Sequence, residues 1–269
     1  MNKTLAKTLF SLFAFTLPVL FSHATAATSA APIAQNAGEK GEVTFYVTRH
    51  GKTLFNTAHR AQGWSDTPLT DAGVEVASQL GRGLKDIHFV GAYSSDAGRA
   101  RQTAKIALAS AGQPLPVTED QRLRETFFGP FEGEHELLMW EPVAKKLGYK
   151  DFAALTQALS KGQVTLKTMM NTLAEVDPSH TTENAAQVHQ RMQAALTDIA
   201  QKVSAQGGGN VLIVSHGMAI MAMLDGMTSE ENLRAPLQNA SVTIITYKDG
   251  QFTVGKVGDM QFVEKGKGL

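Results

Sequence analysis

Short apolar runs alternate along the chain with longer segments in which apolar residues recur every three to four positions. Three runs rich in β-branched and aromatic residues are typical of buried strands, at 42–48, 89–95 and 210–214. Three periodic segments are predicted to be helices, at 71–84, 97–111 and 182–205. Because strands and helices alternate, the sequence predicts an α/β domain with a mostly parallel sheet.

Two further segments complete the predicted domain. Ser241–Val257 alternates around Asp249–Gly250, a dipeptide that strongly favours a hairpin turn, so an antiparallel edge is expected. Residues 134–178 are polar and helical in pattern and contain no strand-like run. They are therefore predicted to form a helical cap insertion.

The first 26 residues have the pattern of a signal peptide. Two lysines precede a 14-residue apolar segment, and Ala24 and Ala26 form a small-residue cleavage pattern. Fourteen apolar residues are fewer than the ~20 that span a bilayer, which argues against a stable membrane anchor. We expect cleavage near Ala26/Ala27, a periplasmic or secreted protein, and a flexible lead-in over 27–41.

Composition limits what the rest of the chain can do. At 269 residues and 43% hydrophobic, it is long enough for one domain with an ample core, predicted over 42–269. The absence of cysteine excludes disulfides and a lipid-modified N-terminus. Basic and acidic residues balance at 25 each, and loss of residues 1–26 removes two lysines and no acid, leaving a formal charge of −2. No general attraction to nucleic acid follows, so any anion must bind at a local site.

Polar residues follow three of the predicted strands. These clusters are Arg49-His50-Gly51, Ser94-Ser95 leading to Arg99, and Ser215-His216-Gly217. Ligands of open α/β sheets bind outside the carboxyl ends of the strands. The fold is therefore expected to bring the three clusters together.

The motifs, in chain order, resemble those of the histidine phosphatase superfamily, in its phosphoglycerate mutase-like branch 1. They are RHGKTLFN (49–56), QGWSDTPLTDAG (62–73), YSSDAGRARQTA (93–104), LRETFFGPFEG (123–133) and SHG (215–217). The resemblance covers about residues 43–260. It implies a three-layer α/β/α sandwich with a helical cap, an exported bacterial member of the family, a small phosphorylated substrate and no cofactor.

The resemblance also implies roles for site residues. His50 is the expected nucleophile, forming a phosphohistidine, and Glu125 the general acid and base. Arg49 and Arg99 are expected to clamp the phosphate with His216, because guanidinium groups match phosphate oxygens. Gly51 is expected to let the backbone approach phosphate.

Several residues have a second interpretation. On composition alone, Glu125 would more often pair with Arg122 or Arg124, and Glu132, Glu134 and Glu136 are alternative carboxylates. Arg101 lies two residues from Arg99 and is expected on another helix face, in solvent or in a structural pair. Family positions suggest substrate contacts at Thr53, Asn56, Gln62, Gly63 and Gly217. The remaining histidines lack metal-binding spacing, so no metal site is predicted.

The same site could hydrolyse a phosphomonoester, transfer phosphate within a phosphoglycerate, or only bind a phospho-ligand. Thr126, Phe128 and Met218 stand where mutases tend to carry polar groups, so a phosphomonoesterase of the histidine acid phosphatase type is favoured. Phytase activity is less expected, because phytate-hydrolysing members carry a different signature after RHG. The sequence leaves the substrate and the oligomeric state open.

The predicted cap could contribute to the pocket or only pack on the core. Packing is favoured for its large apolar residues, which are Met139, Trp140, Phe152, Met169 and Met170. Lys145 and Lys146 are expected on a solvated face.

Overall fold

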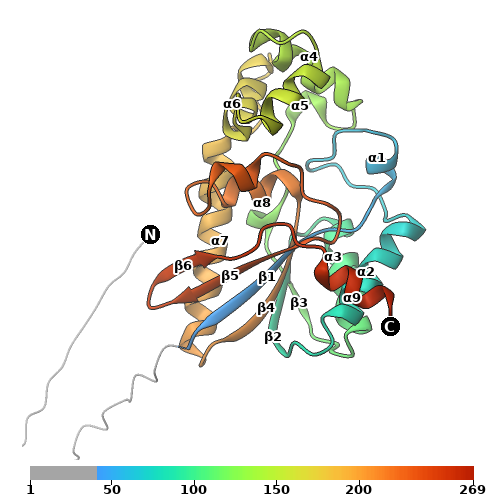
Figure 1. The fold of residues 1–269 in the computed structure, drawn as a ribbon, viewed down its shortest axis with the longest axis vertical. Coiled ribbons are helices and arrows are strands. Elements are labelled where there is room, and N and C mark those ends of the chain that lie inside the picture. The colour runs from blue at the N-terminus through green and yellow to red at the C-terminus, as the bar shows by residue number, and fades with distance from the viewer. Residues whose placement is uncertain (1–40) are drawn as a thin grey trace, which may run out of the picture. The chain divides into compact units, whose positions relative to one another are not determined.

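A computed structural model describes residues 41–269, and Figure 1 shows the arrangement of their elements. The predicted signal peptide and all but the last residue of the predicted lead-in lie outside these residues. Over 41–269, no helix is both long and apolar enough to cross a membrane.

The strands and helices alternate as the sequence predicts. The strands are β1 (Val43–Arg49), β2 (Phe89–Ser94), β3 (Val117–Glu119), β4 (Gly209–Ser215), β5 (Val242–Lys248) and β6 (Gln251–Val254). The helices are α1 (Leu54–Thr57), α2 (Asp71–Gly83), α3 (Gly98–Ser110), α4 (Glu136–Lys146), α5 (Phe152–Ser160), α6 (Leu166–Val176), α7 (Ala185–Ala205), α8 (Gly217–Met223) and α9 (Gln261–Lys267). Short 3-10 turns are η1 (Gln121–Leu123), η2 (Gly129–Phe131) and η3 (Glu230–Leu233).

Within the described residues, six strands form one mixed sheet in the order β3-β2-β4-β1-β5-β6. Strands β1 to β4 are parallel, whereas β5 and β6 form the antiparallel edge. This arrangement confirms the predicted α/β fold with a mostly parallel sheet. The hairpin turns at Asp249 and Gly250, whose φ angles of 50° and 82° are those of a type I′ turn.

Alternate residues of the central strands pack into separate cores on the two faces of the sheet. Phe45 and Ile213 pack with α7, α8 and the cap helices. Tyr46 and Leu212 pack with α2, α3 and α9 on the other face (Figure 1). Parallel strands covered on both faces are continuously apolar, which explains the buried runs in the sequence.

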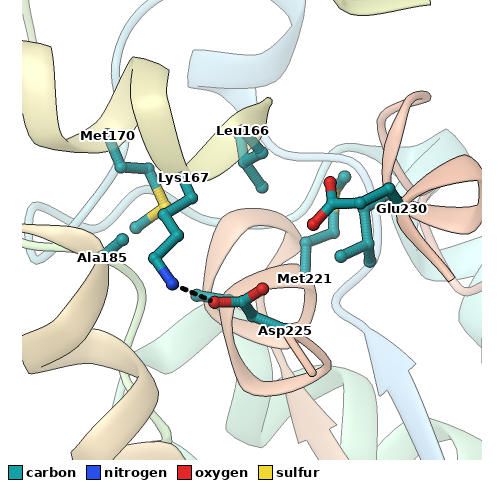
Figure 2. A pocket seen from close by; sticks show the side chains of 9 residues that line it. Leu166, Lys167, Met170, Ala185, Met221, Asp225 and Glu230 are labelled. Atoms are coloured by element: carbon teal, nitrogen blue, oxygen red, sulfur yellow. Dashed lines mark hydrogen bonds and ion pairs between the residues drawn. The ribbon is translucent and has the colours of Figure 1, made fainter. Parts of the chain in front are cut away.

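Residues 134–178 contain the three helices α4, α5 and α6, which lie together beyond the sheet in Figure 1. Helix α6 contacts the segment after α8 through an ion pair of 3.0 Å between Lys167 and Asp225 (Figure 2). At the end of the cap, the buried carboxylate of Asp177 accepts backbone N–H groups of Ser179, Thr181 and Thr182. These contacts fix where the cap joins the domain.

The sequence missed one strand and three short helices and misplaced one helix start. Strand β3 and helices α1, α8 and α9 contain three to seven residues, too few to show a period. Helix α7 begins at Ala185 instead of Thr182, because Asn184 and Gln187 form a capping box there.

Candidate active site

The carboxyl ends of three neighbouring strands bring the sequence clusters together. His50 follows β1, Ser95 lies just beyond β2, and His216 follows β4, which lies between β1 and β2 in the sheet. The His50 and His216 rings are both buried, with centroids 5.1 Å apart. The site is therefore built on the rigid end of the sheet.

A hydrogen bond fixes the tautomer of His50. Its Nδ1 lies 2.7 Å from the carbonyl oxygen of Gly51, and because a carbonyl only accepts, Nδ1 carries the proton. Nε2 is then the free, nucleophilic nitrogen. Burial lowers the pKa of His50 well below its usual value, and the charges of Arg99 and Arg49 lower it further. The imidazole is neutral at physiological pH.

His216 is oriented by Ser95, whose hydroxyl lies 2.7 Å from Nε2. The Ser95 oxygen accepts the backbone N–H of Ala97 at 3.4 Å, and among the described residues its own proton has no acceptor other than His216 Nε2, so Ser95 is assigned as the donor to that nitrogen. His216 Nδ1 then carries the remaining ring proton, and it is buried without a partner. Burial and neighbouring cations also lower the pKa of His216. His216 is thus a neutral hydrogen-bond donor.

The two arginines differ in how they are held. Arg49 donates through Nη1 to the carbonyl of Leu237 at 2.5 Å. Arg99 is fully buried and donates to Asp66 at 2.8 Å and to the carbonyls of Gly63 and Ser65 at 2.7 and 2.9 Å. Both terminal nitrogens of Arg99 therefore anchor the 62–66 loop. The sequence predicted a phosphate clamp at Arg99 and gave no sign of this second, structural role.

The site retains unused donors that suit an anion. The Nε atoms of Arg49 and Arg99 and Nδ1 of His216 are buried and have no hydrogen-bond partner. Buried polar groups in folded proteins almost always have partners, and each unmet donor costs about 1–3 kcal/mol. Three such donors beside His50 fit an oxyanion better than a cation.

The carboxylate of Glu125 lies against the first turn of α8. It accepts the backbone N–H groups of Thr126, Met218 and Ala219 at 2.9, 3.0 and 2.7 Å. Burial raises the pKa of Glu125 above its usual value, although these N–H groups and Arg99 oppose the rise. The raised pKa favours the protonated form that a general acid needs, whereas the three N–H groups favour the carboxylate that a base needs.

The salt-bridge interpretation of Glu125 is wrong. Arg122 pairs with Asp120 and Asp198, and Arg124 pairs with Asp96. Glu125 is left to the backbone donors of α8.

The three alternative carboxylates, Glu132, Glu134 and Glu136, make contacts other than those expected of a general acid. Glu132 accepts the backbone N–H groups of Gly63, Trp64 and Ser65 at 2.7 to 3.2 Å and so shapes that loop. Glu134 is exposed. Glu136 lines the cavity but forms an exposed ion pair with His59 at 3.2 Å. None of the three is held beside the imidazoles as Glu125 is.

The expected substrate-contacting residues divide into two groups. Asn56, Gln62 and Gly217 line a cavity that His50, Arg49 and Glu125 also line. Thr53 is fully buried, caps α1 and donates to Gln62 at 2.6 Å. The N–H of Gly63 donates to Glu132 and its carbonyl accepts from Arg99, so Thr53 and Gly63 act on the site through their neighbours.

Gly51 permits a close contact between two backbone segments beside His50. A Cβ at this position would lie 2.5 Å from the carbonyl oxygen of Gly73, so the two backbones pack directly on each other. The Gly51 N–H donates to Thr103, whose hydroxyl donates to the carbonyl of Arg99. Gly51 thereby ties the His50 loop to α2 and α3.

Three supporting residues were not found from the sequence. Thr103 joins the His50 and Arg99 segments, and Asn239 donates to the carbonyl of His50 at 2.9 Å. Arg191 donates to the carbonyl of Glu125 at 2.8 Å. The latter two contacts join residues far apart in the chain, so no local pattern could reveal them.

Cap residues form much of the cavity wall. Met139, Trp140, Phe152 and Met169 all line the cavity, which corrects the expectation that they only pack the insertion. Met170 instead lines a separate cavity of about 10 Å³ between α6 and α8 (Figure 2).

The basic residues outside the site lie as expected. Arg101 is partly exposed and pairs with Glu119 at 3.4 Å. Lys146 pairs with Glu175, and neither Lys145 nor Lys146 lines the cavity. Over the described range, no group of three His, Cys, Asp or Glu is placed to hold a metal ion.

Comparison with known proteins supplies family context. The sequence model of the histidine phosphatase superfamily (branch 1) matches residues 45–150 and 147–260. A Yersinia pestis (strain Pestoides F) protein named "Probable phosphoglycerate mutase GpmB" is 30% identical over 207 residues, 76% of this chain and 85% of that protein.

Solved structures share the fold. The crystal structure of a phosphoglycerate mutase from Bacillus anthracis str. Sterne matches with a TM-score of 0.80 at 43% identity, over 85% of this chain and 98% of that one. A mycobacterial glucosyl-3-phosphoglycerate phosphatase has the same fold at 23% identity, with a TM-score of 0.61 over 81% of this chain and 99% of its own.

Proposed function

Because this chain belongs to the histidine phosphatase superfamily (branch 1), we propose that it hydrolyses phosphomonoesters through a phosphohistidine on His50. The observation that carries the proposal is the hydrogen bond of 2.7 Å from His50 Nδ1 to the Gly51 carbonyl. It leaves a neutral Nε2 as nucleophile among the unused donors of Arg49, Arg99 and His216.

In the first step, His50 Nε2 forms a bond to phosphorus as the ester P–O bond breaks. Charge on the non-bridging oxygens is met by Arg49 and Arg99 Nε and by His216 Nδ1–H. Glu125 gives its proton to the leaving oxygen, so a neutral alcohol departs and the carboxylate remains.

In the second step, the Glu125 carboxylate takes a proton from water as the oxygen attacks phosphorus. The P–N bond breaks, inorganic phosphate forms, and His50 and protonated Glu125 are restored. One carboxyl thus acts as acid and then as base, and the cycle consumes one water.

Phosphoglycerate mutase activity is the alternative, supported by the names of the similar proteins from Yersinia pestis and Bacillus anthracis. A mutase must retain a carboxylate-bearing product for the return transfer. The cationic side chains among the described cavity-lining residues, His50 aside, are Arg49 and Arg60. Arg60 donates to the carbonyl of Gly133, and Met218 lines the cavity with an apolar side chain, which favours hydrolysis.

One incubation with 3-phosphoglycerate and an alkyl phosphate separates the two functions. A phosphatase releases inorganic phosphate and forms no 2-phosphoglycerate, whereas a mutase forms 2-phosphoglycerate faster than phosphate. If purified protein binds phosphomonoesters without either reaction, it is a binding protein and the proposal fails.

Replacing Arg49 with lysine should weaken phosphate binding. The variant keeps the charge but loses the guanidinium Nε, so the inhibition constant of inorganic phosphate should rise about 10- to 100-fold, the value of one charge-assisted hydrogen bond. The matched control Arg101→Lys should leave it unchanged. An unchanged constant in Arg49→Lys would remove this residue from the clamp.

The pH profile of kcat/KM should be bell-shaped. The first step needs neutral His50, whose pKa lies well below 6.5, and protonated Glu125, whose pKa lies above its usual value. Activity should therefore fall on the acid side as His50 is protonated and on the alkaline side as Glu125 ionises. The alkaline limb should be absent from the profile of Glu125→Gln. Wild type and variant are compared on the same substrate, so ionisation of the substrate affects both profiles equally. Retention of that limb would assign it to another group.

A further inference from the structure

The cavity beside His50 changes character with distance from the imidazole. Arg49, His50, Gln62 and Glu125 form its polar end. The remaining wall is largely apolar and comes from the cap, from α8, from the 236–237 loop, and from residues 56–61 and 128. Its main apolar members are Phe128, Met139, Trp140, Met169, Met221 and Leu237.

Packing between two aromatic rings holds part of the apolar wall in place. The rings of Trp140 on α4 and Phe152 on α5 are stacked, with centroids 6.0 Å apart and planes 7° from parallel. Met139 and Met169 are 3% and 4% exposed, yet both line the cavity, so their side chains are held in place by the cap while facing it. Apart from the indole N–H of Trp140, such a surface offers dispersion contacts and no hydrogen bonds.

Charge and size restrict what can lie against this wall. Beyond the residues at the polar end, the charged side chains among the described lining residues are Arg60 and Glu136, one of each sign. A second phosphate or a sugar would place charge or hydroxyl groups against Met139, Phe152 and Met169 without partners, which is costly. The cavity volume of about 310 Å³ is small for a ligand pocket.

We propose that the substrate is a monoester of a compact apolar alcohol, an alkyl chain or a single aromatic ring, with its phosphate at His50. This inference rests on the proposed phosphatase function and adds its substrate class. The cap side chains then supply binding energy, because the alcohol covers them while the phosphate binds to the arginines.

Unbranched alkyl phosphates from ethyl to hexyl test the proposal, because their primary alcohols are almost equally good leaving groups. We expect kcat/KM to rise about two- to fourfold with each CH₂ until the cavity is filled. Glycerol 1-phosphate, similar in size to butyl phosphate but polar, should be a poorer substrate than butyl phosphate. If the esters are hydrolysed but kcat/KM stays constant or falls as the chain lengthens, the proposed substrate class is wrong and the phosphatase function is unaffected. Absence of hydrolysis across all esters would instead refute the phosphatase function on which it rests.

Two neighbouring methionines of α6 provide a matched pair of variants. Met169→Gln places an amide in the cavity wall, whereas Met170→Gln places one in the separate small cavity of Figure 2. Both introduce a buried polar group, so both should lower the melting temperature. Only Met169→Gln should flatten the dependence of kcat/KM on chain length. If both variants keep the wild-type slope, or both lose it equally, the cavity wall does not select the alcohol.

Discussion

His50→Ala is expected to lower kcat for any phosphomonoester by at least about 10⁴-fold, as loss of a covalent nucleophile does in other enzymes. Nε2 of His50 is the nucleophile of the proposed reaction: it belongs to a buried, neutral imidazole and is left free by the hydrogen bond at Nδ1, whereas Nε2 of His216 is bonded to Ser95. Turnover measured with a purified, folded variant checks this prediction.

Two controls make the result specific. The exposed His88 lies outside the site, so His88→Ala should retain wild-type turnover. Thermal unfolding of His50→Ala should show a folded protein, since the imidazole makes one side-chain hydrogen bond, to Gly51. Turnover in folded His50→Ala within tenfold of wild type would contradict the covalent route.

Glu125→Gln should lower kcat/KM for alkyl phosphates by about 10²- to 10⁴-fold, the usual contribution of a general acid. The amide cannot give a proton to the departing alkoxide. For 4-nitrophenyl phosphate the loss in kcat/KM should be far smaller, because that leaving group departs readily without a proton. The measurement is kcat/KM for both esters in wild type and variant.

The ratio between the two esters distinguishes an acid from a structural residue. Glutamine also loses an acceptor for the N–H groups of α8, so some loss of stability is expected. A purely structural effect would reduce both esters equally, and that outcome would contradict the assignment. Glu134→Gln, at an exposed carboxylate of the same segment, should change neither rate.

Much of the fold followed from the sequence because buried parallel strands are continuous apolar runs. Val43–Arg49 and Gly209–Ser215 were predicted within one residue at each end for this reason. The type I′ hairpin was equally clear, because Asp249–Gly250 supports positive φ angles. Helix α9 was missed because its seven residues show no period and are placed by packing against α2.

The candidate site was predictable only in part. His50 and His216 could be placed together because both follow apolar strands of one sheet. Glu125 was proposed from family resemblance alone, since composition favoured a salt bridge. Two of its three actual partners are backbone N–H groups 93 and 94 residues further along the chain. Asn239 and Arg191 had no local signal for the same reason.

The cap shows another limit of sequence reasoning. A pattern of apolar residues predicts which side chains leave water, and Met169 and Met170 are equally apolar. Only three-dimensional packing shows that Met169 faces the catalytic cavity while Met170 faces a separate one. Substrate preference is therefore read from the structure.

The proposed mechanism requires an intermediate in which Nε2 of His50 carries the phosphoryl group, and rapid-quench labelling can trap that intermediate. Wild type and Glu125→Gln are mixed with ³²P-labelled 4-nitrophenyl phosphate, quenched in alkali, which preserves phosphohistidine, and digested for mass spectrometry. We expect label on His50 at Nε2, with more in Glu125→Gln because that variant lacks the base for hydrolysis. Label on His216, on Nδ1 of His50, or on no residue of an enzyme that turns over would contradict it.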